Sequence, residues 1–147
     1  MSYNTDMKKR NISQIALYRK DGKFLFQHRS SDDKAFPNFW GFFGGPVDEG
    51  ESFIDAVIRE TKEELEYELK DPEFFHEFTL EKESETVHKK SFMEEYDGLQ
   101  KLVLHEGQGM KWLTPMEAKK LKINAWNLDT LDQLQKKLNA IQNDKNI

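Results

Sequence analysis

Six residues of fixed type lie within one window of twenty residues and constrain both the local fold and the chemistry of the chain. They follow the pattern G-x5-E-x7-R-E-x-x-E-E and are Gly45, Glu51, Arg59, Glu60, Glu63 and Glu64. Such a combination at fixed spacing rarely arises by chance. It places a glycine loop directly before a segment that carries clustered acidic residues.

The residues after the glycine loop predict an amphipathic helix. Ser52 followed by Asp55 resembles a capping box, the pattern that opens a helix. Glu60, Glu63 and Glu64 fall within about 100° of one another on one face of this helix. Side chains at helical spacing predict a buried face elsewhere on it, namely Ile54, Val57, Ile58, Thr61 and Leu65.

The acidic face is a candidate metal site. Glu60, Glu63 and Glu64 repel one another, and they lie toward the helix C-terminus, where negative charge is unfavourable. A bound divalent cation would remove both penalties, and carboxylate oxygens suit Mg²⁺ or Mn²⁺ rather than zinc. Ala56 lies on the same face, so we expect no bulky side chain to cover the carboxylates.

A solvated acidic surface is the alternative interpretation of this face. Most acidic helix faces are of that kind and carry pairs four residues apart, such as Lys62 and Glu66. Three neighbouring features favour a binding site instead: the Gly44-Gly45 pair, Glu51 at its offset, and the arginine Arg59 next to the first glutamate.

Composition excludes several classes of function. A chain of 147 residues is long enough for one domain with a real core, and we expect residues 1–147 to form one, with frayed ends at 1–10 and 143–147. The net charge of −5 argues against a nucleic-acid backbone as the main partner. No apolar run is long enough to predict a membrane span. The absence of cysteine excludes thiol catalysis and cysteine-bound metal, and is compatible with a cytoplasmic location.

Strand and helix patterns alternate along the chain and predict the α/β class. Strands are expected over residues 12–19, 24–29, 74–82, 87–96 and 109–113, and residues 39–43 lead into the glycine loop. Besides the acidic helix, one helix is expected to begin at Thr114, which has the N-cap pattern. A last amphipathic helix is predicted by Leu131, Leu134, Leu138 and Ile141.

The glycine, arginine and glutamate pattern resembles the Nudix box. The resemblance implies an α/β/α sandwich with a mixed sheet. It also implies a Mg²⁺-dependent hydrolase, with Mn²⁺ as a possible substitute, that splits a nucleoside diphosphate joined to another group. Its substrate would be a small nucleotide, and the enzyme a possible homodimer.

The resemblance also implies a role for each residue of the box. Glu60 and Glu64 would bind the metal directly, and Glu63 would add a ligand or act through water. Arg59 would orient Glu60, and Glu51 would join the same network. We therefore take Glu60, Glu63 and Arg59 as candidate catalytic residues. The glycines Gly44 and Gly45 would let the backbone approach the metal and the substrate phosphates.

Three positions depart from the Nudix pattern. Thr61 stands where an aliphatic residue is usual, and its similar volume should preserve the packing. Glu66 replaces the glycine that normally follows the helix, and Tyr67 follows in place of an aliphatic residue. Without glycine at this position, we expect the helix to continue toward Leu69 before Pro72 stops it.

A second acidic candidate lies outside the box. The segment Glu106-Gly107-Gln108 resembles one in MutT-like nucleoside triphosphatases, where its glutamate approaches the metal and serves as base. Glu106 is therefore a candidate metal ligand and catalytic residue. The consecutive acids Glu94 and Glu95 compete for this role, because Nudix enzymes vary in which outer glutamate serves.

Candidate substrate-binding residues follow from the same resemblance. Arg29 ends a predicted strand, where basic residues of the family often meet phosphates. Asn127 and Trp126 lie where related triphosphatases contact the nucleobase, although Asn127 could also be the N-cap of the last helix. Aromatic residues over residues 36–43 could line a base pocket or pack into the core.

The substrate is inferred by elimination. Residues 73–86 lack the proline and the tyrosine that mark ADP-ribose and dinucleoside polyphosphate enzymes, respectively. This absence and the Glu106 segment favour hydrolysis of a nucleoside triphosphate, or a modified one, to monophosphate and pyrophosphate. A nucleotide-sugar or ADP-ribose-type diphosphatase is the first alternative. A non-catalytic nucleotide-sensing module is an alternative of another class.

Overall fold

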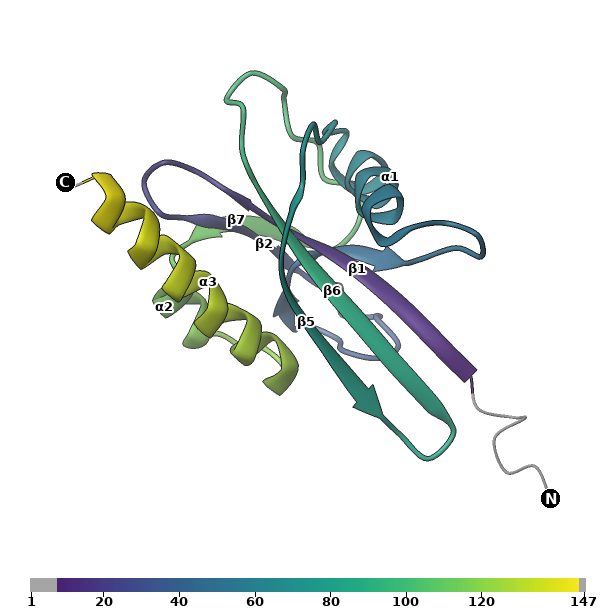
Figure 1. Ribbon diagram of the computed structural model, residues 1–147. Helices are drawn as coiled ribbons and strands as arrows, with labels where there is room; N and C mark the ends of the chain where they lie inside the picture. Colours follow the sequence, from purple (N-terminus) through teal and green to yellow (C-terminus); the bar gives the residue numbers. More distant parts are fainter. Residues whose placement is uncertain (1–7, 146–147) are drawn as a thin grey trace.

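The computed structural model describes residues 8–145, and it shows one mixed sheet between helices (Figure 1). The strands are β1 (Lys8–Tyr18), β2 (Phe24–His28), β3 (Trp40–Gly41), β4 (Phe43–Pro46), β5 (Glu73–Glu81), β6 (Glu85–Glu95) and β7 (Gly109–Leu113). The helices are α1 (Phe53–Leu65), α2 (Pro115–Lys119) and α3 (Ala125–Lys145). Helix α1 covers one face of the sheet, and α2 and α3 cover the other, so the predicted α/β/α sandwich is confirmed.

Strand β1 is the central strand of the sheet. It runs parallel to β6 over its whole length, from Lys8 opposite Glu85 to Tyr18 opposite Glu95. On its other side it pairs antiparallel with β4 and then with β2. Strand β3 and strand β7 extend the sheet beyond β2, and β5 closes it beyond β6. The middle of β1, residues 12–15, therefore lies between β4 and β6, and this part of the sheet carries the site described below.

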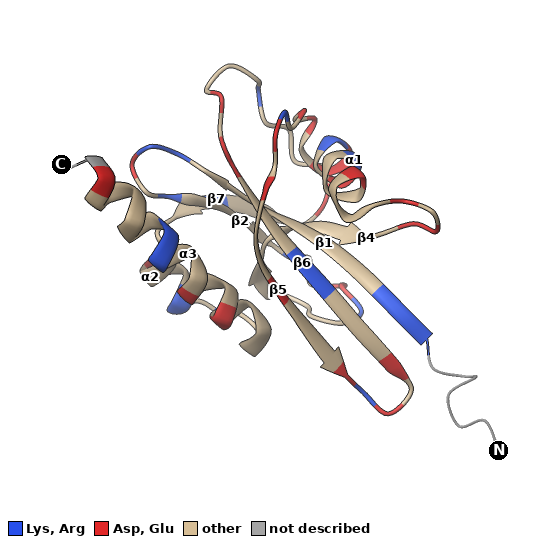
Figure 2. Cartoon of the chain, in the orientation of Figure 1, with Lys and Arg blue, Asp and Glu red and all other residues tan. Residues whose placement is uncertain are grey.

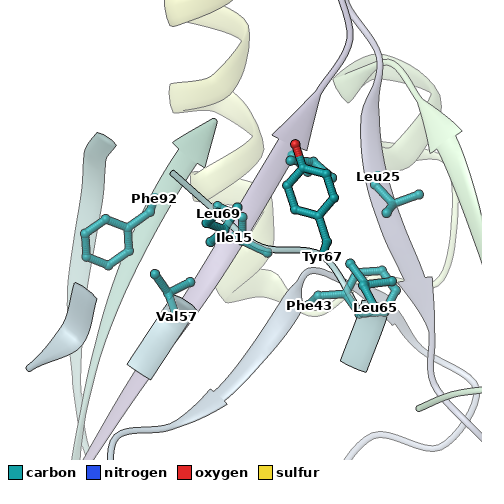
Figure 3. Packing of buried hydrophobic residues seen from close by; sticks show 9 residues of the cluster. Ile15, Leu25, Phe43, Val57, Leu65, Tyr67, Leu69 and Phe92 are labelled. Carbon is teal, nitrogen blue, oxygen red and sulfur yellow. The ribbon is translucent and has the colours of Figure 1, made fainter. Parts of the chain in front are cut away.

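Alternation along the strands divides the core into two layers, because successive side chains of a strand point to opposite faces. In β1, Ile15 and Leu17 pack toward α1, whereas Ala16 packs toward α2 and α3. The layer on the α1 side is shown in Figure 3 and consists of Ile15, Leu17, Leu25, Phe43, Val57, Leu65, Tyr67, Leu69 and Phe92. The opposite layer consists of Ala16, Phe24, Phe26, Phe42, Met93, Ala118, Leu131 and Leu134.

The start of α1 is as predicted, but one residue of its buried face is not. The Ser52 hydroxyl accepts a hydrogen bond from the Asp55 backbone N–H at 3.0 Å, which caps the helix. Val57, Thr61 and Leu65 are buried as expected. The expectation for Ile54 was wrong, because this residue of the first turn is 46% exposed.

The predicted extension of α1 toward Leu69 was also wrong. The helix ends at Leu65, and Glu66 takes the left-handed conformation with φ 55° and ψ 33°. Its N–H donates to the Lys62 carbonyl at 3.0 Å, so Glu66 performs the capping that glycine usually performs. The chain then turns back and buries Tyr67 and Leu69 in the core. This burial outweighs the cost of about 1–2 kcal/mol for a side chain in the left-handed region.

Three other boundaries differ from the prediction. Strand β1 already begins at Lys8 and α3 continues through Lys145, so residues 8–10 and 143–145 belong to regular elements rather than frayed ends. The remainder of the expected frayed ends lies outside the described residues. The two glycines belong to β4 and not to a loop, because they pair with β1. In the described part of the chain, no helix is long and apolar enough to cross a membrane.

The left-handed cap yields a stability prediction. Glu66→Gly should raise the free energy of unfolding by about 1 kcal/mol relative to Glu66→Ala, because glycine adopts this conformation without the steric cost of a Cβ. The alanine variant is the matched control, since both changes remove the exposed contact of Glu66 with His105. Urea denaturation measures the difference. Equal stability of the two variants would contradict this account of how α1 ends.

Candidate active site

Arg59 lies midway along α1 and is the centre of an ionic network. Its guanidinium donates two hydrogen bonds to the Glu51 carboxylate, both at 2.9 Å. The same group donates to Glu60 at 2.9 Å, to Glu63 at 3.3 Å and to the Pro46 carbonyl at 3.0 Å. The hydrogen bonds from Arg59 to Glu51 are the largest cause that lowers the pKa of the Glu51 carboxyl, to about 2. The structure thus places the Arg59 guanidinium against the Glu60 carboxylate, the side chain that the resemblance expects it to orient.

The two glycines of β4 lie directly against the acidic residues. The Gly44 N–H donates to the Glu64 carboxylate at 2.9 Å. A Cβ at Gly44 would lie 2.2 Å from the Ser13 carbonyl oxygen, and one at Gly45 would lie 2.6 Å from the carboxyl carbon of Glu60. Any side chain at either position would therefore push the strand or the carboxylate away, which explains why glycine is needed here.

Glu64 is the most unusual acid of the site. It is 3% exposed, and its Oε2 has no hydrogen-bond partner among the described residues. Burial is the first cause that raises the pKa of Glu64 to about 10, followed by the neighbouring Glu106 carboxyl and the charge of Glu60. The expectation of an uncovered acidic face was thus wrong, because Ala56 and Glu64 both face the interior of the protein.

Burial decreases along the acidic face from Glu64 to Glu63. The Glu60 side chain is 12% exposed and the Glu63 side chain is 59% exposed. Burial is the largest cause that raises the pKa of Glu60, and the charges of Glu63 and Glu106 add to it. The hydrogen bond from Arg59 opposes this rise. The site therefore contains one exposed carboxylate and two that are held out of water.

The segment that contains Glu106 lies beside β2 and brings a further carboxylate to the site. Gly107 has φ +96°, and a Cβ there would lie 2.7 Å from the His28 carbonyl oxygen. The Gln27 side chain donates to the Glu106 carbonyl at 2.9 Å, and the Gln108 N–H donates to the His28 carbonyl at 2.8 Å. These contacts anchor the segment to β2 and bring Glu106 next to Glu64.

The competing acids at the end of β6 have a different environment. The Glu94 carboxylate accepts hydrogen bonds from the backbone N–H groups of Lys70, at 3.0 Å, and Asp71, at 2.7 Å. It thereby caps the turn before β5, and Glu95 is exposed. Of Glu94, Glu95 and Glu106, it is Glu106 that the fold places beside the carboxylates of α1.

A cleft of about 260 Å³ opens on the face of the sheet that carries α3. Gly44, Gly45 and Glu106 line it, so it adjoins the acidic cluster. The predicted phosphate contact Arg29 also lines the cleft, where it forms an ion pair with Asp33 at 2.9 Å. The candidate metal residues and the candidate substrate residues therefore meet along β4.

The predicted base-contacting residues line the same cleft. Asn127 and Trp126 both line it, and Asn127 is 4% exposed. The alternative role of Asn127 as N-cap was wrong, because α3 begins at Ala125 and the Asn124 side chain accepts from the Asn127 N–H at 2.9 Å. Phe36 contacts the Trp126 ring edge to face, with centroids 5.6 Å apart.

Sequence reasoning missed two polar residues of the cleft, Gln14 on β1 and Lys89 on β6. Both are buried, and the Gln14 amide donates to the Ser91 hydroxyl at 2.8 Å. The signal was present in the alternation of β6, since Lys89 has the same parity as the buried residues Val87 and Met93. Figure 2 shows the contrast in charge, with acidic residues on α1 and the segment before it, and basic residues on β6 and at the start of β1.

The acidic cluster fits a hard divalent cation. Among the described residues, no three acidic or histidine side chains already form a metal ligand set. Arg59 holds Glu60 and Glu63 in its own hydrogen bonds. The unpaired Oε2 of Glu64, however, lies near the carboxylates of Glu60 and Glu106, and carboxylate oxygens are the donors that Mg²⁺ and Mn²⁺ prefer.

Comparison with known proteins identifies the family. The NUDIX domain model matches residues 7–134. The chain belongs to the Nudix family. The CTP pyrophosphohydrolase of Escherichia coli K12 is 32% identical over 105 residues, which cover 70% of this chain and 75% of that protein. Nucleoside triphosphatase NudI of Escherichia fergusonii is 41% identical over 49 residues, covering 33% of this chain and 35% of that protein.

The Nudix fold agrees with solved structures. The crystal structure of a MutT protein from Methanosarcina mazei Go1 has a TM-score of 0.78 at 18% identity, over 90% of this chain and 96% of that one. Family and relatives together show that the chain is a hydrolase acting on acid anhydrides in phosphorus-containing substrates. The box carboxylates and the adjoining cleft are its candidate active site.

The buried carboxyl of Glu64 yields a second stability prediction. Glu64→Gln should raise the free energy of unfolding in chelator by about 1–3 kcal/mol at pH 7, because glutamine needs no proton to become neutral. The raised folded-state pKa means that wild-type stability falls as pH rises above about 4.5, so the gain should be smaller at pH 5.

Urea denaturation of wild type and variant at both pH values measures this gain. Glu68→Gln is the matched control, because Glu68 is exposed and its replacement should change stability by less than about 0.5 kcal/mol. A loss of stability in Glu64→Gln would show that the buried carboxyl is favourable in the metal-free protein.

Proposed function

We propose that the protein is a Mg²⁺-dependent pyrophosphohydrolase that converts a nucleoside triphosphate, or a modified one, and water to a nucleoside monophosphate and pyrophosphate. The observation that carries this proposal is the position of Gly44 and Gly45. They touch the Glu60 and Glu64 carboxylates and also line the cleft. A diphosphate bound along β4 would therefore lie beside the acidic cluster, while the nucleoside extends into the cleft.

Each residue of the site has a role that its contacts support. Glu60 and Glu64 would hold the metal, with Glu63 as a further ligand or acting through water. When bound, the metal supplies charge neutralisation of the phosphates and a water of lowered pKa. Arg59 orients Glu60, and Glu51 holds Arg59 in place through its two hydrogen bonds.

Glu106 completes the reaction as proton acceptor in this proposal. It lines the cleft and lies beside Glu64, so its carboxylate faces both the ligands and the substrate. The attacking water forms a new P–O bond and passes a proton to the carboxylate of Glu106. The bond to the bridging oxygen breaks and pyrophosphate leaves. Arg29 neutralises phosphate charge from the cleft wall.

The triphosphate substrate is supported by the relatives. The CTP pyrophosphohydrolase of Escherichia coli aligns with most of this chain, and the shorter NudI alignment also points to a triphosphatase. The cleft is lined by aromatic side chains and by amides, a combination suited to a nucleobase. We therefore place the base against the aromatic surface of Phe36 and Trp126 and the phosphates beside Gly44 and Gly45.

Turnover of a nucleotide panel tests this proposal. We expect Mg²⁺-dependent pyrophosphate release from at least one triphosphate, and a loss of about 100-fold or more in Glu64→Gln, because the metal supplies several kcal/mol of transition-state stabilisation. The panel contains the ribo- and deoxynucleoside triphosphates, oxidised dGTP, ADP-ribose, sugar nucleotides and dinucleoside polyphosphates. Glu68→Gln is the matched control and should retain wild-type turnover.

Each other outcome of this panel points to a different function. Cleavage of ADP-ribose or a sugar nucleotide without cleavage of triphosphates would replace the proposed substrate and keep the site. Tight nucleotide binding without any turnover would indicate a nucleotide-sensing module. Full activity of Glu64→Gln would show that Glu64 is not a metal ligand.

A separate pair of variants tests the outer glutamate. Glu106→Gln should lower kcat at least about 10-fold, because glutamine cannot accept the proton, while Glu94→Gln should keep wild-type kcat. Glu94→Gln should instead lower stability by about 1 kcal/mol, since its carboxylate accepts two backbone hydrogen bonds. Steady-state kinetics and urea denaturation measure the two effects. If Glu94→Gln lowered kcat and Glu106→Gln lowered only stability, the catalytic role would belong to Glu94.

A further inference from the structure

A lysine is buried in the wall of the cleft. Lys89 is 8% exposed and lines the cleft. Lysine is rarely buried in proteins unless a carboxylate pairs with it. Burial, followed by the positive charges of Arg29 and Arg10, lowers the pKa of Lys89 to about 8. Arg29 and Arg10 are themselves paired with carboxylates, whereas none of the ion pairs among the described residues includes Lys89.

The strand geometry directs Lys89 into the cleft. Val87 and Lys89 line the cleft from the same face of β6, while the intervening His88 and the following Lys90 point to the opposite face. Lys90 lies over the Phe53 ring at 4.6 Å from its centroid, on the α1 side. Lys89 lies instead near aromatic rings, 5.7 Å from the centroid of Phe78 and 5.8 Å from that of Trp126.

The side chains around Lys89 suit a nucleobase, which is a flat aromatic ring with polar groups at its edge. Phe36 and Trp126 present aromatic surface in the cleft, and the Gln14 and Asn127 amides lie 3.5 Å apart beside it. Aromatic faces bind a nucleobase by stacking, and buried amides read its edge. An ammonium is different from these amides, because it only donates hydrogen bonds.

The register of the sheet separates Lys89 from the phosphate end. Ile12 on β1 pairs with Pro46 on one side and with Lys89 on the other. Lys89 is therefore two strand spacings, or about 10 Å, from the residue that follows Gly45. A substrate whose diphosphate lies at Gly44 and Gly45 would present its base, rather than its phosphates, to Lys89.

We propose that Lys89 is a specificity-determining residue whose ammonium donates a hydrogen bond to an exocyclic carbonyl oxygen of the nucleobase. This inference rests on the proposed function and adds a substrate class, the bases that carry a keto oxygen. Cytosine, uracil, thymine, guanine and hypoxanthine belong to this class. Adenine presents an amino group, itself a donor, where hypoxanthine presents its oxygen. A hydrogen bond from this ammonium to a keto oxygen favours those bases over adenine, which gains no such bond.

The test compares wild type, Lys89→Met and the matched control Lys90→Met. The methionine keeps the length of the side chain and removes the ammonium. For CTP and ITP, kcat/KM should fall about 10- to 100-fold in Lys89→Met, the range for a hydrogen bond to a charged group. For ATP it should change less than about twofold, and Lys90→Met should leave all three substrates unchanged.

Binding of products gives a readout that does not depend on catalysis. Calorimetry in chelator with CMP, IMP, AMP and ribose 5-phosphate should show weaker binding of CMP or IMP to Lys89→Met. The affinity for AMP and for ribose 5-phosphate, which has no base, should be unchanged. Urea denaturation checks that the variant is folded, and Lys89→Gln serves as a second uncharged variant if the methionine disturbs the fold.

Two results would overturn the assignment of Lys89. An equal loss of affinity for ribose 5-phosphate would show that Lys89 binds the phosphate or the sugar. Unchanged binding of both CMP and IMP would show that it binds no part of the nucleotide. If wild type hydrolyses no triphosphate but CMP or IMP binding still depends on Lys89, the proposed function is wrong and the base contact stands.

Discussion

The close packing of β4 against the carboxylates of α1 is the contact on which the site depends. Gly44 and Gly45 pair with β1 through their backbone and leave no room for a Cβ. The space is filled by the Glu60 carboxylate, and the Gly44 N–H binds Glu64. One strand thereby joins the acidic helix on one face of the sheet to the cleft on the other. Without this contact the metal residues and the substrate residues would belong to separate surfaces.

The ionic network and the buried carboxyl act in opposite directions on the stability of the fold. Glu51 and Arg59 form a partly buried pair whose hydrogen bonds favour the charged forms of both residues. Glu64 is held in a place that disfavours its charge, beside two other acids. A fold selected only for stability would avoid such a group. The arrangement is understandable if the charge of Glu64 is completed by a cation, and this agrees with the trade-off between stability and activity at many active sites.

Much of the fold and of the box followed from the sequence, because local patterns encode them. The alternation of β1 and the capping pattern of Ser52 each depend on neighbouring residues only. Glu66 was misjudged because the burial of Tyr67 and Leu69 decides where the helix ends, and this burial is a property of the whole core. The contribution of Lys89 was missed for a similar reason. The place of Lys89 in the alternation of β6 depends on neighbouring residues only, but the cleft that it faces is built from β1, β4 and the start of α3.

In the proposed function, the site separates the chemistry from the recognition of the substrate along one direction of the sheet. The carboxylates lie at the edge of β4, and the cations and amides of β1 and β6 line the cleft beyond them. Arg29 and Arg10 have carboxylate partners that reduce their positive charge, whereas Lys89 keeps its charge in a place shielded from water. A hydrogen bond there is stronger than one at the surface, because little water competes for it. The same scaffold could therefore change its preferred base by substitution at β6 without altering the residues that hold the metal.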